Sequence, residues 1–189
     1  MKGEYYKTKE SVAEYAKLAK DVHGGDLIEK LKVFLPAEAT ILEIGSGPGT
    51  DWNILSQTHK TVGSDNSLEF LKYLSAKFPK GSFLELDAVT LKTEKKFYAL
   101  YSNKVLHHLQ DQELAASIQR QHSILEADGI ICHSFWRGEG SEVFKGLFVN
   151  YHTKAGLRQF FEPYFEVALL ENYAEFDEGD SVLLIGRRK

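Results

Sequence analysis

Cysteine is nearly absent from the sequence, because Cys132 is the only one among 189 residues. A single thiol cannot form a disulfide within the chain, so a disulfide-stabilised fold is excluded and a reducing compartment is favoured. No apolar stretch approaches the roughly 20 residues of a membrane-spanning helix. The first residues also lack the apolar core and the small-residue cleavage site of a secretory signal. We therefore expect a cytoplasmic protein that has no membrane segment.

A surplus of positive charge is absent as well. The chain has 23 Lys and Arg against 27 Asp and Glu, which gives a net charge of −4 at pH 7. Proteins whose main partner is a nucleic acid usually carry a basic surplus. The local basic clusters at residues 92–96 and 187–189 are not interleaved with aromatic side chains that could stack on bases. The charge balance thus disfavours nucleic acid as a partner.

Metal-binding patterns are also missing. The chain has seven histidines, but no spacing of His133 or the other histidines matches a zinc motif. We expect no metal site.

The sequence does contain a glycine-rich loop after a short apolar run. Residues 41–44 are mostly apolar, and glycine then occupies alternate positions at Gly45, Gly47 and Gly49. Glycine permits positive φ angles and lets backbone N–H groups approach a ligand without a Cβ atom in the way. The pattern predicts a strand that leads into a cofactor-binding loop, although such a turn also occurs without any ligand.

The residues around this loop distinguish between two kinds of cofactor. A dinucleotide fingerprint, G-x-G-x-x-G, would place its third glycine where this chain has Thr50. Glu43 precedes the loop and Asp51 follows it, and these carboxylates would repel an anionic pyrophosphate. A ligand that carries an ammonium, a sulfonium and a ribose diol suits these charges better.

The segment Glu43-x-Gly45-x-Gly47-x-Gly49 resembles the first motif of the class I S-adenosylmethionine-dependent methyltransferases. Signals similar to that family follow in order: Asp65 after residues 61–64, Asp87 and Ala88 after residues 82–86, the segment 102–109 after residues 97–101, and a glycine turn before a fifth strand at residues 125–131. The resemblance implies S-adenosylmethionine as the cofactor.

The resemblance also assigns the residues that contact this cofactor. They are Glu43, Gly45, Ser46, Gly47 and Gly49 for the methionine end, Asp65 and Asn66 for the ribose and adenine, Asp87 and Ala88 for the adenine edge, and Ser102 and Asn103 for the carboxylate or amino group. The family often has an apolar residue at the position of Asn66, so the partner that stacks on the adenine stays open. Asp65 and Asp87 could equally be helix caps, since aspartate is common at helix starts.

Candidates for the acceptor side lie after the fourth apolar run and outside the cofactor segments. His107 and His108 are candidate acid–base catalysts, because imidazole titrates near neutral pH. Histidines at such a place can instead fix a loop by hydrogen bonds. Candidate substrate residues are Tyr5, Tyr6, Tyr15, Trp136, Arg137 and Tyr151. Aromatic rings and an arginine can clamp a flat or anionic molecule, although the same residues could serve only in packing.

One motif of the resembled family is absent. The chain has no Asn/Asp-Pro-Pro-Tyr/Phe sequence after the fourth apolar run. Because the family uses that motif on amide and nucleobase amino groups, its absence disfavours those acceptors.

The periodicity of apolar residues predicts alternating strands and helices. We expect helices at residues 11–21, 26–35, 50–57, 67–78, 111–127 and 153–161, and strands at 41–44, 61–64, 82–86 and 97–101, a fifth ending at residue 135, and two more at 165–171 and 181–186. The segment 172–180 is too short for a helical crossover, so the last two strands should be antiparallel. This order predicts an α/β three-layer sandwich with a seven-stranded, mostly parallel sheet whose last strand is antiparallel, similar to the Rossmann-like methyltransferase fold.

The length of the chain fits one domain. We expect a single methyltransferase domain over residues 1–189, with residues 1–36 as an N-terminal helical lid. The resemblance implies an enzyme that transfers a methyl group to a small-molecule acceptor by in-line displacement. The alternative is a non-catalytic subunit of the same fold that binds the cofactor or activates a partner. The oligomeric state, monomer or homodimer, and the acceptor atom stay open.

Overall fold

The computed structural model describes residues 8–19, 22–144 and 146–189. Tyr5 and Tyr6, two of the predicted substrate residues, lie outside these ranges. Among the described residues, no helix combines the length and the apolar composition that a membrane span requires.

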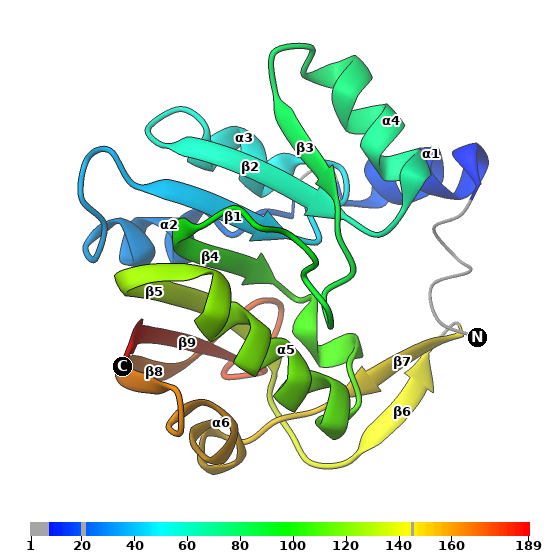
Figure 1. Ribbon diagram of the computed structural model, residues 1–189. Coiled ribbons are helices and arrows are strands. Elements are labelled where there is room, and N and C mark those ends of the chain that lie inside the picture. Colours follow the sequence, from blue (N-terminus) through cyan, green and yellow to red (C-terminus); the bar gives the residue numbers. More distant parts are fainter. Residues whose placement is uncertain (1–7, 20–21, 145) are drawn as a thin grey trace.

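Seven strands form one sheet in the order β3-β2-β1-β4-β5-β9-β8 (Figure 1). They are β1 (Thr40–Ile44), β2 (Lys60–Asp65), β3 (Ser82–Glu85), β4 (Phe97–Asn103), β5 (Leu125–Trp136), β8 (Phe165–Tyr173) and β9 (Ser181–Arg188). Strands β1 to β5 pair in parallel, whereas β9 is antiparallel to both of its neighbours, β5 and β8. The connection 174–180 before β9 holds no helix, which is why β8 and β9 pair as a hairpin. The predicted sheet with an antiparallel last strand is confirmed.

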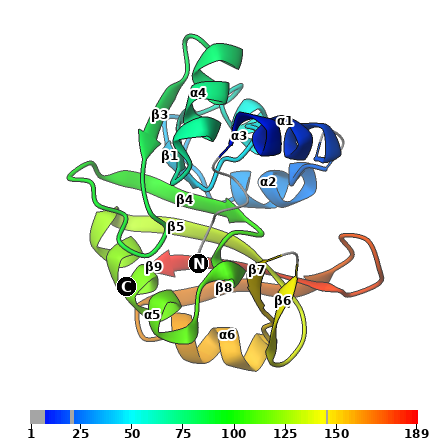
Figure 2. The ribbon, with the colours of Figure 1, turned by 90° about the vertical axis from the view of Figure 1, so that its right-hand side faces the viewer.

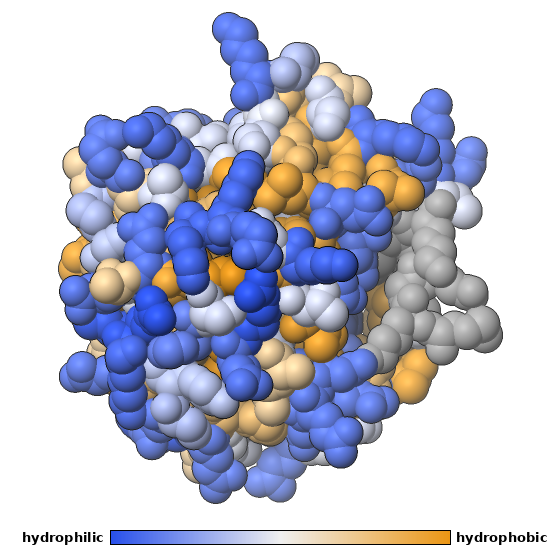
Figure 3. All heavy atoms as spheres, in the orientation of Figure 1, coloured by the Kyte–Doolittle hydropathy of each residue, from blue (hydrophilic) through white to orange (hydrophobic). Residues whose placement is uncertain are grey.

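Helices cover both faces of this sheet and complete three layers. They are α1 (Lys9–Leu18), α2 (Gly25–Lys32), α3 (Thr50–Leu55), α4 (Leu68–Lys77), α5 (Asp111–Ile124) and α6 (Lys154–Phe161), with a short 3-10 helix η2 (Leu106–His108). Alternate residues of β9 point to opposite cores: Val182 and Leu184 pack with α5 and α6, and Leu183 and Ile185 pack with α2 and α3. Figure 2 shows α2 and α5 on opposite sides of the sheet accordingly. On the face that carries α5, hydrophilic side chains are interspersed with smaller apolar patches (Figure 3).

The end of α5 differs from the prediction. The helix ends at Ile124 rather than at Ala127, and Leu125 already pairs with Phe97 as the first residue of β5. The ladder then skips to the pair of Ala99 with Ile130, so the residues between form a bulge. Within that bulge Asp128 adopts a φ of +58°. Pairing with β4 therefore takes over residues whose local pattern continues the helix.

A hairpin after β5 is absent from the predicted elements. It consists of β6 (Ser141–Phe144) and β7 (Leu147–Asn150), which pair in antiparallel fashion. All four residues of β6 are exposed, so the alternation of apolar and polar residues that marks a half-buried strand is missing. Asn150 Nδ2 donates to Asp111 Oδ1 at 2.8 Å and ties the hairpin to the start of α5. The connection after β5 therefore contains a hairpin that the sequence pattern does not indicate.

The glycine-rich loop follows β1 and has a left-handed backbone at each of its three glycines. The φ angles are +71° at Gly45, +48° at Gly47 and +78° at Gly49. A Cβ atom on Gly45 would lie 2.6 Å from Val105 Cγ2, and one on Gly49 would lie 2.5 Å from Leu74 Cδ2. A Cβ atom on Gly47 would meet no heavy atom closer than 3.9 Å. The loop is therefore packed at both ends and open in the middle.

This difference predicts unequal effects of alanine at two of these positions. Gly47→Ala should lower the free energy of unfolding by about 1 kcal/mol, because it adds only left-handed strain. Gly45→Ala should lower it by roughly 2–4 kcal/mol, since the new methyl group also collides with Val105. Urea unfolding followed by circular dichroism measures both values. Removing the collision with Val105→Ala in the Gly45→Ala background should recover part of the loss, and equal losses in the two single variants would contradict this account.

Candidate functional site

The carboxyl ends of β1, β2 and β4 carry most of the predicted cofactor residues, and Glu43 on β1 has the most unusual environment. It is 4% exposed, and its Oε2 atom has no hydrogen-bond partner within the described residues. Burial, followed by the charges of Asp51 and Asp65, raises the pKa of Glu43 to about 8. Hydrogen bonds from Ser46 and from the backbone of Trp52 oppose this shift only in part. Glu43 is therefore mostly protonated at neutral pH unless a cation lies beside it.

Asp51, in the first turn of α3, joins three parts of the site. Its Oδ1 accepts a hydrogen bond from the backbone N of Gly24 at 2.7 Å. Its Oδ2 accepts from the Tyr101 hydroxyl at 2.7 Å and from Asn103 Nδ2 at 3.1 Å. These bonds connect the start of α2 and the end of β4 to the glycine loop. Asp51 is not among the predicted site residues, although its position directly after the glycine-rich loop could have indicated it.

Asp65 ends β2 and holds the middle of the glycine loop. Its Oδ2 accepts from the backbone N of Gly47 at 3.0 Å, and its Oδ1 accepts from the backbone N of Ser67 at 2.9 Å. Burial raises the pKa of this carboxyl group, and the backbone hydrogen bonds oppose the rise. Each oxygen retains a second lone pair that could accept from a ribose hydroxyl. Asn66, the neighbouring predicted residue, is exposed.

Ser46 links the glycine loop to β2. Its hydroxyl oxygen accepts from the backbone N of Ser64 at 3.1 Å, and its own backbone N donates to the Ser64 carbonyl at 2.7 Å. The predicted residue Ser46 therefore fixes the loop against the neighbouring strand.

Asp87 follows β3 and caps a turn, not the helix that its alternative interpretation predicts. Its Oδ1 accepts from the backbone N of Val89 at 2.9 Å and of Thr90 at 3.0 Å. Its Oδ2 makes no hydrogen bond within the described part of the chain, and the residue is exposed. The cap thus leaves one carboxylate oxygen available at the edge of the sheet. The carbonyl of Ala88 accepts from the Ser117 hydroxyl at 2.6 Å.

The two predicted residues at the end of β4 have different surroundings. Asn103 Nδ2 donates to Asp51, and its Oδ1 accepts from the Ser134 hydroxyl at 2.5 Å. The side chain of Ser102 is fully buried, and its hydroxyl lies 2.8 Å from His133 Nδ1. Ser102 can therefore offer only its backbone to a ligand at the sheet edge, whereas its side chain belongs to the layer of α5.

The adjacent histidines after β4 differ in their free nitrogens. His107 is 3% exposed, and its Nδ1 atom is buried without a partner within the described residues. Burial, together with the nearby His108, Lys104 and His152, holds the pKa of His107 well below its usual range. His108 Nδ1 lies 2.7 Å from the Phe148 carbonyl. Because a carbonyl only accepts, this nitrogen carries the proton and Nε2 of a neutral His108 remains an acceptor.

His152, directly after the hairpin, is a third imidazole that the sequence pattern does not reveal. It is 5% exposed, and its Nε2 atom has no partner in the described segments. Its backbone N donates to the Trp136 carbonyl at 3.0 Å, and its ring lies 5.2 Å from the Phe135 ring. Separation along the chain hides this neighbour of His107. No three His, Cys, Asp or Glu side chains gather closely enough to hold a metal ion within residues 8–19, 22–144 and 146–189.

Trp136 lies at the end of β5 beside a half-buried lysine. Lys104 Nζ is 3.6 Å from the centre of the Trp136 ring, and the Phe176 ring stacks on Trp136 at 5.9 Å. Burial lowers the pKa of Lys104 to about 8, against the opposing charges of Glu175 and Asp180. The His107 ring meets Trp136 edge-on at 6.4 Å. Trp136 thus stands between the end of β4 and the loop before β9.

The other predicted substrate residues are dispersed. Tyr15 of α1 lies next to the open middle of the glycine loop, and its ring meets the Phe70 ring edge-on at 5.9 Å. Tyr151 donates its hydroxyl to Glu142 Oε1 at 2.6 Å within the hairpin, and Arg137 is exposed. The structure therefore brings Tyr15 to the glycine loop, whereas Tyr151 bonds to the nearby Glu142 and the backbone N of Arg137 donates to the Asp180 carbonyl at 2.7 Å.

The side chains at the sheet edge fit the chemistry of S-adenosylmethionine. The unpartnered Oε2 of Glu43 can accept an ammonium, the lone pairs of Asp65 can accept a ribose diol, and Oδ2 of Asp87 can accept an adenine amino group. A Cβ atom on Gly47 would meet only Tyr15 Cε1, at 3.9 Å, so the backbone of the loop is not tightly packed there. Two shallow surface hollows lie instead at the amino ends of β1 to β4, and their lining residues include Lys60, Thr61 and Ser82.

Residues 41–129 match a sequence-family model described as "Methyltransferase domain". The search of curated proteins found no match.

Solved structures with the same fold extend over nearly the whole chain. A 1,6-didemethyltoxoflavin-N1-methyltransferase from Burkholderia thailandensis, with its substrate and S-adenosylhomocysteine bound, has a TM-score of 0.78 and 18% identity, covering 95% of this chain and 84% of its own. A TehB-like methyltransferase from Corynebacterium glutamicum has a TM-score of 0.75 and 20% identity, covering 96% and 98%. A structure of the Haloferax volcanii Trm112 activator in complex with a putative methyltransferase gives a TM-score of 0.79 and 17% identity, covering 100% and 99%.

The sequence match extends from β1 through β4 to the first residues of β5, and the fold match covers 95% of the chain. In the sequence of residues 41–129 and in its fold, this protein is similar to the class I S-adenosylmethionine-dependent methyltransferases.

Proposed function

We propose that this protein transfers the methyl group of S-adenosylmethionine to a small-molecule acceptor. Glu43 carries the proposal, because a buried carboxyl group whose Oε2 lacks a partner in the described ranges is a site for a cation. When bound, the cofactor supplies an electrophilic methyl group on a sulfonium. The contribution of the chain is then to hold two reactants close and in line.

The proposed cofactor contacts follow the strand ends. Glu43 and the backbone of Gly47 would hold the methionine end, Asp65 the ribose, and Asp87 the amino group of the adenine. Asn103 would act beside them through Asp51, to which its side chain is hydrogen bonded. Gly45, Ser46 and Gly49 would shape the loop, Asn66 and Ala88 would line the ribose and adenine, and Ser102 would contribute its backbone.

His107 is the proposed general base for an acceptor that loses a proton. Its pKa lies well below the usual range because of burial, so the ring is neutral at physiological pH. Its Nδ1 lacks a partner among the described residues, whereas Nδ1 of His108 is engaged with the Phe148 carbonyl. We assign His108 the role of holding the hairpin and Trp136 that of a wall for a flat acceptor.

The neighbouring structures support a small acceptor. The Burkholderia enzyme is described with bound 1,6-didemethyltoxoflavin. Among the described residues, the connection between β5 and α6 contains only the two short strands of the hairpin, so it offers little chain to enclose a large acceptor.

A partner-activated subunit is the second candidate. The methyltransferase of Haloferax volcanii is seen in complex with the Trm112 activator. For this chain, tight cofactor binding without transfer to small molecules would favour that role.

The first prediction concerns cofactor binding and Glu43. S-adenosylhomocysteine should bind and release up to about one proton at pH 7, because an ammonium lowers the raised pKa of Glu43 and ionises it. Affinity should therefore increase as the pH rises toward 8. Calorimetry in buffers of different ionisation enthalpy measures the proton count. Glu43→Gln should abolish the linked release, and preferential binding of a nicotinamide dinucleotide would refute the proposed function.

The second prediction concerns methyl transfer and His107. With methyl-labelled cofactor and a low-molecular-weight filtrate of a cell extract, label should enter small molecules. His107→Gln should slow this transfer by roughly 10²-fold or more, as expected when a general base is lost. At saturating cofactor the wild-type rate should stay flat between pH 8 and 6, because the ring is already neutral there. His108→Gln is the matched control, and an equal loss of rate in both variants would argue against a base at His107 alone.

A third prediction concerns the N-terminal segment 1–36, which we propose acts as a lid. Within it, Tyr15 lies beside Gly47 and contacts Phe70, so a ligand in the loop should hold α1 in place. Limited proteolysis should cut within α1 more slowly when S-adenosylhomocysteine is present. Tyr15→Ala should remove most of this protection. Equal cutting of the free and bound protein would contradict the lid.

A further inference from the structure

We propose that a chain of hydrogen bonds through buried side chains positions the Asp87–Ala88 segment for recognition of the adenine amino group. The chain runs from Ser102 on β4 through His133 on β5 to two residues of α5, and it ends on the carbonyl of Ala88. The inference rests on the proposed function, since it takes Asp87 as the residue that accepts from the adenine.

The four links are short and continuous. The Ser102 hydroxyl lies 2.8 Å from His133 Nδ1, and His133 Nε2 lies 2.8 Å from Gln121 Oε1. Gln121 Nε2 lies 3.1 Å from the Ser117 hydroxyl oxygen, which lies 2.6 Å from the Ala88 carbonyl. Residues of β4, β5 and α5 therefore all contribute to holding the loop that contains Ala88.

Elementary hydrogen-bond chemistry determines the direction of every link. The Ala88 carbonyl can only accept, so the Ser117 hydroxyl donates to it and must itself accept from the amide nitrogen of Gln121. The amide oxygen of Gln121 then faces His133 Nε2, which must donate. His133 Nδ1 is consequently the acceptor for the Ser102 hydroxyl. All donors point toward Ala88, and no link can be reversed alone.

The chain lies in a dry interior. Ser102, His133, Gln121 and Ser117 each have 0% exposure, and the ring of Phe161 lies 5.9 Å from the ring of His133. Burial lowers the pKa of His133 to about 3, so the ring stays neutral and keeps one donor and one acceptor. Because an unmade hydrogen bond is expensive at such a place, a shift of the Ala88 carbonyl away from Ser117 is opposed.

Local bonds alone do not place this loop on the sheet. Asp87 accepts from Val89 and Thr90 through Oδ1, and the backbone N of Leu91 donates to the Asp87 carbonyl at 2.8 Å. These bonds shape the turn from within. The Ser117 bond instead joins the turn to α5, directly beside Asp87, and the chain behind Ser117 leads back to the end of β4.

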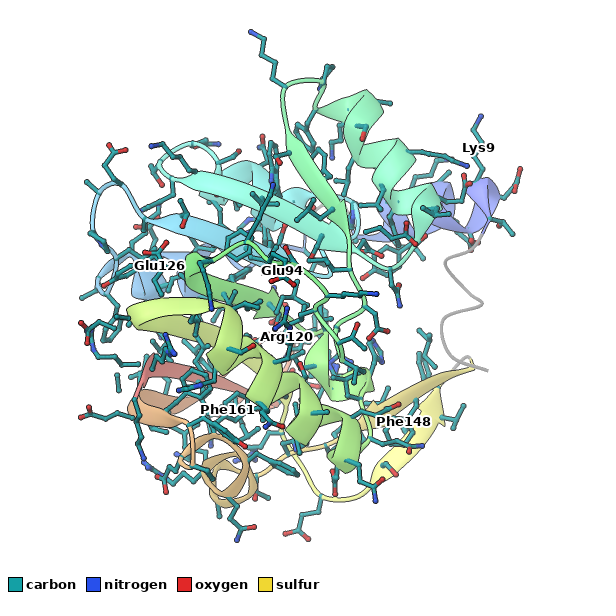
Figure 4. The ribbon with its side chains drawn as sticks, viewed as in Figure 1. Lys9, Glu94, Arg120, Glu126, Phe148 and Phe161 are labelled. Atoms are coloured by element: carbon teal, nitrogen blue, oxygen red, sulfur yellow. The ribbon has the colours of Figure 1, made fainter. Side chains whose placement is uncertain are left out.

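Arg120 of α5 holds a later part of the same loop. Its Nε donates to the Leu91 carbonyl at 3.1 Å and its Nη2 to the Thr93 carbonyl at 2.6 Å. Figure 4 labels Arg120 on α5 and Glu94 in this loop. Arg120 therefore secures the far end of the loop, and Ser117 secures the end that carries Asp87.

The experiment compares two ligands that differ at the purine amino group. Calorimetry gives the dissociation constants of S-adenosylhomocysteine and S-inosylhomocysteine, which lacks that amino group, for the wild type and for Ser117→Ala. The wild type should prefer S-adenosylhomocysteine, and Ser117→Ala should reduce the preference on the order of tenfold, the size of one hydrogen bond. Ser123→Ala, on the same helix, removes a hydroxyl that bonds to Arg120 rather than to Ala88, so it should keep the wild-type preference.

The outcomes separate this inference from the proposed function. If the wild type does not bind S-adenosylhomocysteine, the proposed function fails and the inference fails with it. If the wild type prefers S-adenosylhomocysteine and Ser117→Ala keeps the full preference, the inference alone is overturned. Equal binding of both ligands by the wild type would mean that the protein does not recognise the adenine amino group, and this result would also overturn the inference.

A second measurement needs no variant and covers the case in which Ser117→Ala does not fold. Long-range ¹H–¹⁵N correlation spectra of the wild type should show His133 neutral at pH 6 with the proton on Nε2. A proton on Nδ1, or a charged ring, would break the direction of the chain and overturn the inference. Ser117→Cys keeps the shape of the side chain, although sulfur is larger than oxygen, and donates only weakly, so it should lose the preference as Ser117→Ala does.

Discussion

Three carboxyl groups share a poorly solvated corner at the ends of β1 and β2, and the rest of the site depends on how their charges are accommodated. Asp51 is satisfied by three donors and Asp65 by two backbone amides. Glu43 has an oxygen without a partner in the described chain, and its pKa rises to about 8. Because Glu43 is buried beside two other carboxyl groups and its hydrogen bonds compensate only in part, its anion is favoured only beside a cation. This constraint favours an ammonium-bearing cofactor over a pyrophosphate.

The helices on the two faces of the sheet hold different parts of the proposed site. On the side of α2 and α3, Asp51 links the start of α2, through Gly24, and β4, through Tyr101, to the glycine loop. On the side of α5, Ser117 and Arg120 hold the loop that follows β3. Period-two alternation in β4 sends Tyr101 to the first face and Ser102 to the second. Adjacent residues of one strand thereby support opposite ends of the proposed cofactor site.

The proposed acceptor side consists of segments that are far apart in the chain. His107 lies in η2, Trp136 ends β5, and His152 is the second residue after β7. Lys104 packs its ammonium on the Trp136 ring. The rings of His107, His152 and Trp136 carry no negative charge, and Lys104 is a cation beside them, so a neutral or proton-donating acceptor would suit these residues better than a cation.

The amino-acid sequence by itself determined the alternation of strands and helices, the antiparallel last strand and the glycine loop, since apolar period, glycine spacing and connection length are local properties. It also placed Glu43, Asp65 and Asp87 at strand ends. The sequence did not predict that β5 begins at Leu125, where the local pattern continues the helix, nor did it predict the exposed hairpin. The reason is that pairing with a distant strand overrides local preference. Only the tertiary structure decided that the hydroxyl of Ser102 belongs to the interior. Its bond to His133 joins residues 31 positions apart, and no local pattern records which distant donor will meet which acceptor.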